Sequence, residues 1–450
     1  MNFLKAAKSC ELHVHLGGCL SAENLLELGR DMYRDVDWSG FCDAYQVAFG
    51  TRPDPVALYQ AALSGAPDGL ANFAEHYVFS QRDGGDFGRF RAKYTLINCL
   101  ARHWISVLNR DGGPVYRLVV ANHLQEGVDF VEYRLSGGGE TPEGFRHLHY
   151  GFVQELQEAA QHGIIARHII SLRRDAALED YALVQYLLDQ QPEAIPTVVG
   201  VDFSDIEEGR PPKILRPFFA RLQHENKQRP ERALEVVYHV GESYFDKSLE
   251  SAVRWCHQAA ELGARRLGHA IALGLDGAIA IGRRPDAHAT EPASERLDQI
   301  AYDLEYSAQL ASYGVEVDPK ALAEERAALQ KIDPDEPIHR PYNERRLREI
   351  IGRQQYVLDR LAQRGTIIEC CPTSNLRIGG VPDEAHHPVH RFLDSQVNLV
   401  ICADDPGIFG TTLADEVDWV LAHSKWRAED LDKRLGDPRR FQLGSARSNL

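Results

Sequence analysis

The first chemistry-bearing feature of the chain is the segment CELHVHLGG, residues 10–18, which places two histidines two residues apart. Side chains at positions i and i+2 of a strand point to the same face. If this segment is a strand, His13 and His15 both reach one point, and neutral imidazole is a common zinc ligand. The pair alone is also compatible with a hydrogen-bonded core histidine beside a surface one, so its interpretation depends on the rest of the chain.

Further polar residues lie at the ends of later apolar segments: His239 in VVYHV, His269 in RLGHA, and Asp404 in ICADDP. His239 and Asp404 would add one nitrogen and one oxygen to the first two histidines. Three nitrogens and one carboxylate form a set that suits catalytic zinc, with a position left for water. We therefore predict one zinc ion, held by His13, His15, His239 and Asp404.

Two residues are suited to the remaining steps of a hydrolysis. Glu242, three residues beyond His239, could shuttle protons, and His269 could hold or polarise a hydroxide. His269 taken alone is also compatible with a structural role. The segment that carries Asp202 and Ser204 has no lysine that could be carboxylated to bridge two ions, so one metal is favoured.

The elements that must position these residues are eight short, β-branched, nearly continuous apolar segments, the pattern of strands buried on both faces. They are residues 10–18, 128–136, 166–174, 197–204, 235–242, 265–270, 365–372 and 397–406. Helical patterns such as SLESAVRWCHQAAELG lie between them. Eight strands alternating with helices predict a (β/α)8 TIM barrel, in which the chemistry collects where the strands end.

Two stretches are too long for one crossover. Residues 31–115 form a mixed helical stretch, and a long interval separates His269 from Glu369. The middle of that interval, approximately 283–342, is charged and turn-rich with a helical portion. We predict a helical insertion there, between strands 6 and 7 of a single domain covering residues 1–450. It is either a solvated packing element or a lid or oligomer contact.

The composition narrows the classes of partner. Of 450 residues, 44% are hydrophobic and 26% charged, and the formal net charge is −16. Such a chain is a globular protein, and its negative field disfavours polymeric nucleic acid and anionic membranes. No apolar run is long enough for a membrane helix, and the residues before the first strand lack the apolar core and small-residue cleavage site of a secretory signal. We therefore expect a cytoplasmic protein with a small-molecule substrate. The eight cysteines are typical of reduced core thiols, and a homo-oligomer stays open.

The motifs resemble those of the adenosine deaminase family of barrel aminohydrolases. The matching segments, in the family's order, are ELHVHLGG, VVGVDFSDIEEG, VVYHVGES, RLGHA, IIECCPTSN and VNLVICADDPGIF. The resemblance implies zinc bound by the same four residues. It also implies that Glu242 donates a proton to the purine N1, that His269 orients the attacking hydroxide, and that Asp405 accepts a hydrogen bond from the ring at N7. The implied reaction adds hydroxide to C6 of a 6-aminopurine and releases ammonia, giving the 6-oxopurine.

Two candidate substrate-binding positions depart from the family's pattern. Gly17 stands where nucleoside-acting members typically have an acidic residue that meets the ribose. Asp205 stands where the family typically has a glycine whose backbone meets the N3 side of the purine. Either a shifted loop restores the contact, or the pocket accepts a different base or substituent.

Three functions therefore stay open. The first is deamination of adenosine, 2′-deoxyadenosine or a related 6-aminopurine. The second is hydrolysis of another purine base, nucleotide derivative or modified adenine with the same metal set. The third is a non-catalytic purine-binding or assembly protein, and the presence of Glu242 and His269 beside the zinc ligands argues against it.

Several other polar residues have two interpretations. Arg134 and Arg173 either grip a phosphate or carboxylate or, as we expect, pair with barrel acids such as Glu132. Ser374 and Asn375 either line the pocket or cap the helix that follows them.

Overall fold

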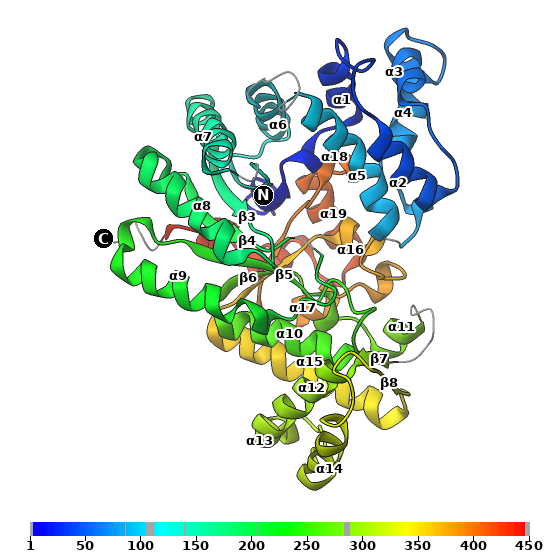
Figure 1. Ribbon diagram of the computed structural model, residues 1–450, viewed down its shortest axis with the longest axis vertical. Helices are drawn as coiled ribbons and strands as arrows, with labels where there is room; N and C mark the ends of the chain where they lie inside the picture. The colour runs from blue at the N-terminus through cyan, green and yellow to red at the C-terminus, as the bar shows by residue number, and fades with distance from the viewer. Residues whose placement is uncertain are drawn as a thin grey trace.

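The computed structural model describes residues 3–85, 87–104, 112–138, 141–204, 206–282 and 289–445. Eight parallel strands form a sheet that curls into a barrel with helices around it (Figure 1). In order of pairing, the strands are β1 (Cys10–His15), β2 (Phe130–Ser136), β3 (Ile165–Ser171), β4 (Val198–Asp202), β5 (Glu235–Val240), β6 (Ala264–His269), β9 (Ile367–Cys370) and β10 (Asn398–Ile401). All eight predicted strands are present, and the (β/α)8 barrel is confirmed.

The seam between β10 and β1 is joined by main-chain hydrogen bonds just beyond the end of β10. The amide of His15 donates to the carbonyl of Asp404, and the amide of Asp404 donates to the carbonyl of His13, both over 2.9 Å. Segments from opposite ends of the chain therefore lie side by side where the candidate metal ligands stand.

Crossover helices cover the outside of the barrel because parallel strands need connections that run back along the sheet. The helices after β2 to β5 are α7 (Pro142–Ala159), α8 (Ala177–Gln190), α9 (Arg216–Gln228) and α10 (Leu249–Leu262). The helices after β9 and β10 are α16 (Pro372–Arg377), α17 (Val389–Asp394), α18 (Pro406–Phe409), α19 (Leu413–His423) and α20 (Ala428–Leu435). Among the described residues, no helix is both long and apolar enough to cross a membrane.

A helical group between β1 and β2 stands beside the barrel, at the top and upper right of Figure 1. Its first helix begins at a capping box, in which Ser21 and Asn24 each accept a hydrogen bond from the other's backbone amide. The group consists of α1 (Ala22–Gly29), α2 (Ser39–Phe49), α3 (Pro55–Leu63), α4 (Gly69–Tyr77), α5 (Phe87–Arg102) and α6 (Gly113–Gln125). This group accounts for the long mixed helical stretch of the sequence.

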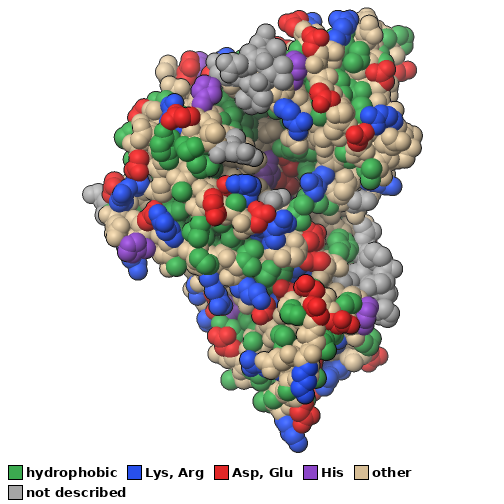
Figure 2. Space-filling view, in the orientation of Figure 1, with side chains coloured by type: hydrophobic (Ala, Val, Ile, Leu, Met, Phe, Trp, Pro, Cys, Tyr) green, Lys and Arg blue, Asp and Glu red, His purple; other side chains and the backbone are tan. Residues whose placement is uncertain are grey.

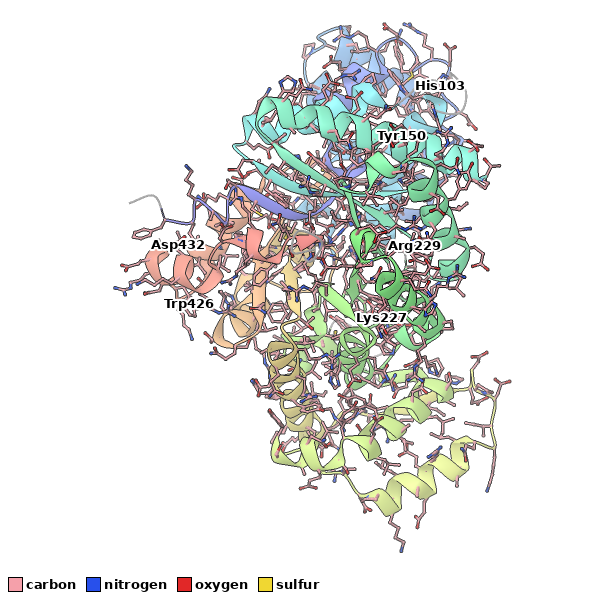
Figure 3. All side chains as sticks on the ribbon, turned by 90° about the vertical axis from the view of Figure 1, so that its left-hand side faces the viewer. His103, Tyr150, Lys227, Arg229, Trp426 and Asp432 are labelled. Atoms are coloured by element: carbon pink, nitrogen blue, oxygen red, sulfur yellow. The ribbon has the colours of Figure 1, made fainter. Side chains whose placement is uncertain are left out.

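The interval between β6 and β9 contains a lobe that projects from the barrel at the bottom of Figures 1 and 3. The whole interval comprises α11 (Gly277–Gly282), β7 (Ala289–Pro292), α12 (Ala293–Glu305), α13 (Ser307–Ser312), α14 (Pro319–Leu329), β8 (Pro337–Arg340) and α15 (Glu344–Arg364), with α13 and α14 at the bottom of Figure 1. Strands β7 and β8 form a separate antiparallel pair. Residues 283–288 of the predicted insertion lie outside the described residues. That the whole chain is a single domain stays a prediction.

Candidate active site

Four side chains converge at the carboxyl ends of β1, β5 and β10. The ligand atoms of His13, His15, His239 and Asp404 all lie within 4.8 Å of one another. His15 Nε2 is 3.2 Å from His239 Nε2, and His13 Nε2 is 3.3 Å from Asp404 Oδ1. The fold thus brings together the four residues that the sequence predicted as zinc ligands.

The protonation states of these four side chains suit the binding of a divalent metal ion. Burial lowers the pKa of His15 and of His239 well below the ordinary value, so both rings are neutral and offer a lone pair. Burial would raise the pKa of Asp404, but the electrostatic interaction with the adjacent His13 ring holds it well below its usual range, so the carboxyl is ionised. His13 Nε2 is buried with no hydrogen-bond partner among the described residues. An unpartnered nitrogen in this set is what a bound metal would satisfy.

Two further carboxylates hold the histidines in place. Asp202 Oδ1 lies 3.1 Å from Nδ1 of His239, and Glu369 Oε2 lies 3.0 Å from Nδ1 of His13. A carboxylate at Nδ1 fixes the proton there and turns Nε2 toward the metal position. The motifs alone give these two residues no role, although their signal is visible as carboxylates within apolar strands.

Arg134 pairs with barrel acids, as expected, but not with Glu132, which was the example. Arg173 instead pairs with Asp180 of α8, over 2.6 Å, and lines the cavity of the site. Arg134 Nη2 lies 2.6 Å from Glu369, and its Nε is 3.4 Å from Asp202. Glu132 instead pairs with Arg266. Arg134 therefore supports both carboxylates that hold the histidines. Burial would raise the pKa of Glu369, but Arg134 and Arg266 hold it well below its usual range.

Glu242 lies on the turn after β5. Burial raises its pKa to about 7, so the carboxyl carries a proton for much of the population near neutral pH. Glu207 fixes this turn: its Oε1 accepts from the amide of Gly241 over 3.0 Å, and its Oε2 accepts from the amide of Glu242 over 3.2 Å. A carboxylate on the neighbouring connection thus positions the candidate acid.

His269 faces Glu242 across the floor of the site. Its Nε2 is 3.7 Å from Glu242 Oε1, and its Nδ1 is 3.0 Å from the side-chain oxygen of Asn375. Burial would lower the pKa of His269, but the carboxylates of Glu242 and Asp404 raise it above the ordinary value. Asn375 lies within α16 and makes no side-chain cap, so the capping interpretation is wrong for this residue and its contact is with the site.

The backbone is strained at two of these residues. His269 and Asp404 both have a φ of 63°, the left-handed region that non-glycine residues rarely adopt. Such strain persists where the surrounding structure over-determines it, and it gathers at functional sites.

Asp405 follows Asp404 in the chain and lines the same cavity as Glu242 and His269. Burial, with Asp404 and Glu242 adding to it, raises the pKa of Asp405 well above the ordinary value. A protonated carboxyl donates a hydrogen bond, and N7 of a 6-aminopurine is an acceptor with no proton of its own. A hydrogen bond between Asp405 and N7 therefore needs the proton on Asp405, and this role of Asp405 stays a prediction.

The site opens into a cavity of about 820 Å³. Figure 2 shows this face of the molecule hollowed near its centre, with histidine and acidic side chains at the bottom of the hollow. The lining includes His15, His239, Glu242, His269, Asp404 and Asp405. Among the described residues, Gly17 does not line the cavity, and Asp205 lies outside the described residues.

Residues 349–436 match the family model of adenosine deaminase. The resemblance to this family is confirmed. The adenine deaminase of Rhizobium leguminosarum bv. trifolii is 45% identical over 60 residues, which are 13% of this chain and 19% of that protein. The adenosine deaminase-like protein of Drosophila melanogaster is 44% identical over 59 residues, 13% of this chain and 18% of that protein. The matches thus span about a fifth of each relative.

Solved structures of the deaminase type share the fold over nearly the whole chain. Adenine deaminase from Arthrobacter aurescens has a TM-score of 0.56 and 16% identity, covering 98% of this chain and 94% of that one. An amidohydrolase from Burkholderia ambifaria with bound Zn has a TM-score of 0.54 and 15% identity, covering 99% and 89%. The Arabidopsis N6-mAMP deaminase has a TM-score of 0.55 and 15% identity, covering 99% and 97%. At these identities the likeness shows the fold.

One wall of the cavity was not identified from the deaminase motifs. It is formed by the face of α5 that carries Arg91, Tyr94, Thr95 and Asn98. Their signal is the helical spacing of polar residues within FGRFRAKYTLINCLAR, opposite the buried Leu96 and Leu100. That spacing alone does not say which way the helix faces.

Proposed function

We propose that this protein is a zinc-dependent hydrolytic deaminase that converts a 6-aminopurine to the 6-oxopurine and ammonia. The observation that carries the proposal is that one ligand atom from each of four residues, His13, His15, His239 and Asp404, lies within 4.8 Å of the others. Glu242 and His269 line the same cavity. The matches to adenine and adenosine deaminases and the similarity of the fold support it.

His13, His15, His239 and Asp404 would hold one zinc ion. When bound, zinc acts as a Lewis acid that lowers the pKa of a water molecule and so provides a nucleophile near neutral pH. The presence of Zn in the structure of the Burkholderia ambifaria amidohydrolase supports this choice of metal.

The chain's own residues supply the other requirements. Glu242, protonated near neutral pH, donates its proton to N1 of the purine and so relieves the charge that develops on the ring. His269, held by Asn375, orients the attacking water. Asp405 donates to N7 and fixes the ring in its plane.

Adenosine and 2′-deoxyadenosine are the first substrates to consider, on the strength of the motifs. A modified nucleotide is the second, because a structural neighbour is an N6-mAMP deaminase and the cavity of about 820 Å³ has room for more than a base.

The test is ammonia release by the purified, zinc-supplemented protein. The panel is adenosine, 2′-deoxyadenosine, adenine, AMP, cyclic AMP and N6-methyl-AMP, the last followed by methylamine release, with Asp404→Ala as the blank. Release above the blank from at least one member supports the proposal. Zinc binding without release from any member would contradict it and favour a purine-binding role.

A further inference from the structure

Tyr94 of α5 fills the space that a side chain at position 17 would occupy. A Cβ built on Gly17 would lie 2.7 Å from the Tyr94 hydroxyl oxygen and 3.5 Å from Ile97 Cγ2. The first distance is too short for two such atoms, whereas the second is an ordinary contact. Gly17 therefore marks a position whose space has been taken over by a residue from another element.

The position of Tyr94 is fixed by the packing of α5. The Phe90 ring, one turn earlier, stacks on Phe409 of α18 with centroids 5.4 Å apart, and the centroid of the Tyr94 ring lies 5.8 Å from that of Phe90. Lys93 Nζ donates to the carbonyls of Glu75 and Val78, both over 2.7 Å. Helix α5 is thus packed against α18, which follows Asp405, and hydrogen-bonded to the end of α4. These contacts restrict the position of the Tyr94 side chain.

The Tyr94 hydroxyl differs chemically from the acidic side chain that nucleoside-acting family members typically have at position 17. Burial raises the pKa of Tyr94 well above the ordinary value, so the phenol keeps its proton. A backbone hydrogen bond involving Gly18 acts in the opposite direction, which is the effect of an amide donating to the phenol oxygen. The hydroxyl proton then remains to be donated. A carboxylate in this place would only accept hydrogen bonds and would carry a negative charge.

We propose that Tyr94 is the residue that determines which substituent on the purine is accepted, in place of a side chain at position 17. The inference rests on the proposed deaminase function and deepens it. Tyr94 lines the cavity together with His15 and Asp405, whereas Gly17 lies behind it. The favoured substituent offers an oxygen that accepts a hydrogen bond from the phenol, either a sugar oxygen or a phosphate oxygen.

The kinetic test compares the protein with its Tyr94→Phe variant on adenine, adenosine and AMP. Losing one neutral hydrogen bond is expected to lower kcat/KM for adenosine or AMP about 5-fold relative to adenine, mainly through KM. A change for adenosine and AMP alike identifies a sugar oxygen, and a change for AMP alone identifies the phosphate. Tyr150→Phe is the matched control, since Tyr150 lies on α7 away from the cavity and bonds to Glu193 (Figure 3). An equal change on all three substrates would overturn the proposal.

A second test needs no activity. Gly17→Ala places a methyl against the Tyr94 oxygen, and Tyr94→Phe removes that oxygen and leaves contacts of 3.5 Å. We expect Gly17→Ala to lower Tm by about 2 °C in the otherwise unchanged protein and by much less when it is combined with Tyr94→Phe. An equal loss in both backgrounds, or none in either, would overturn the proposal.

Together, the kinetic test and the thermal test distinguish failure of the deaminase proposal from failure of the role proposed for Tyr94. If the wild-type protein turns over no purine while the thermal coupling between positions 17 and 94 is present, the deaminase proposal fails and the packing of Tyr94 stands. If purines are turned over but Tyr94→Phe changes adenine, adenosine and AMP equally, the deaminase proposal stands and the role of Tyr94 is wrong.

Discussion

The two walls of the candidate site are built in different ways. The metal-binding wall stands on the strands: His13 and His239 are 0% and 5% exposed, and each is held by a buried carboxylate. The opposite wall is a helix face, where Arg91 and Asn98 are exposed. Buried, mutually supported groups are positioned before a ligand arrives, whereas exposed helix residues can change without disturbing the barrel. We infer that chemistry is fixed on one wall and specificity on the other.

Removing a strand-borne ligand should have the largest effect. His239→Ala is expected to lose tight zinc binding and to lower kcat by more than the roughly 100-fold that loss of an outer partner costs. Zinc content after dialysis and ammonia release measure the two effects. His224→Ala, an exposed histidine on α9, is the control and should keep both. Full activity of His239→Ala would contradict the assignment of the chemistry to the strand-borne wall.

Changing the candidate acid should separate metal binding from turnover. Glu242→Gln keeps the shape of the side chain but has no proton to give, so kcat should fall by about 10² to 10⁴ while zinc stays bound. Zinc content and kcat measured on the same preparation check this. Glu231→Gln, on the surface, should change neither. Near-normal turnover would remove Glu242 from the acid role.

Replacing a carboxylate that holds a zinc-ligand histidine in place should reduce zinc affinity less than removing the histidine does. Asp202→Asn keeps the size of the side chain but removes the charge at Nδ1 of His239, so the zinc affinity should fall about 10-fold. Competition with a chelator measures the affinity. Asp418→Asn, which breaks an exposed ion pair with Lys8, is the control. An unchanged affinity would mean that the carboxylate only fills space.

The pKa of Glu242 predicts the alkaline side of the pH profile. The acid works only while it is protonated, and its pKa is about 7. The value of kcat/KM should therefore fall above about pH 7, approaching 10-fold per pH unit, as Glu242 loses its proton. Initial rates on both sides of this pKa measure the fall. A profile that keeps rising well above the pKa of Glu242 would contradict the assignment.

The helix wall should give the smallest change. Arg91→Gln is expected to raise KM for AMP a few-fold without changing kcat, because an exposed positive charge attracts the phosphate weakly through water. Arg229→Gln, at the end of α9 on the outer surface (Figure 3), is the control. A loss of kcat instead of a rise in KM would mean that this wall takes part in the chemistry.

The strand-borne wall could be predicted from the sequence, whereas the helix wall could not. His13 and His15 are two residues apart on a strand, so their common direction follows from local geometry, and Asp404 joins them because strand ends meet in a barrel. The direction in which α5 faces depends on its packing against α2, α4 and α18, which no local pattern encodes. Tyr94 could not be found for that reason, and Gly17 alone could not reveal what fills its space.

We propose that one zinc ion on the strand-borne wall supports deamination of a 6-aminopurine. The most direct test is titration of zinc into the metal-depleted protein while ammonia release is followed with the best substrate of the panel. We expect activity to rise from the level of the Asp404→Ala blank and to reach a plateau at one zinc per chain. Full activity without metal, or none at one zinc per chain, would contradict it.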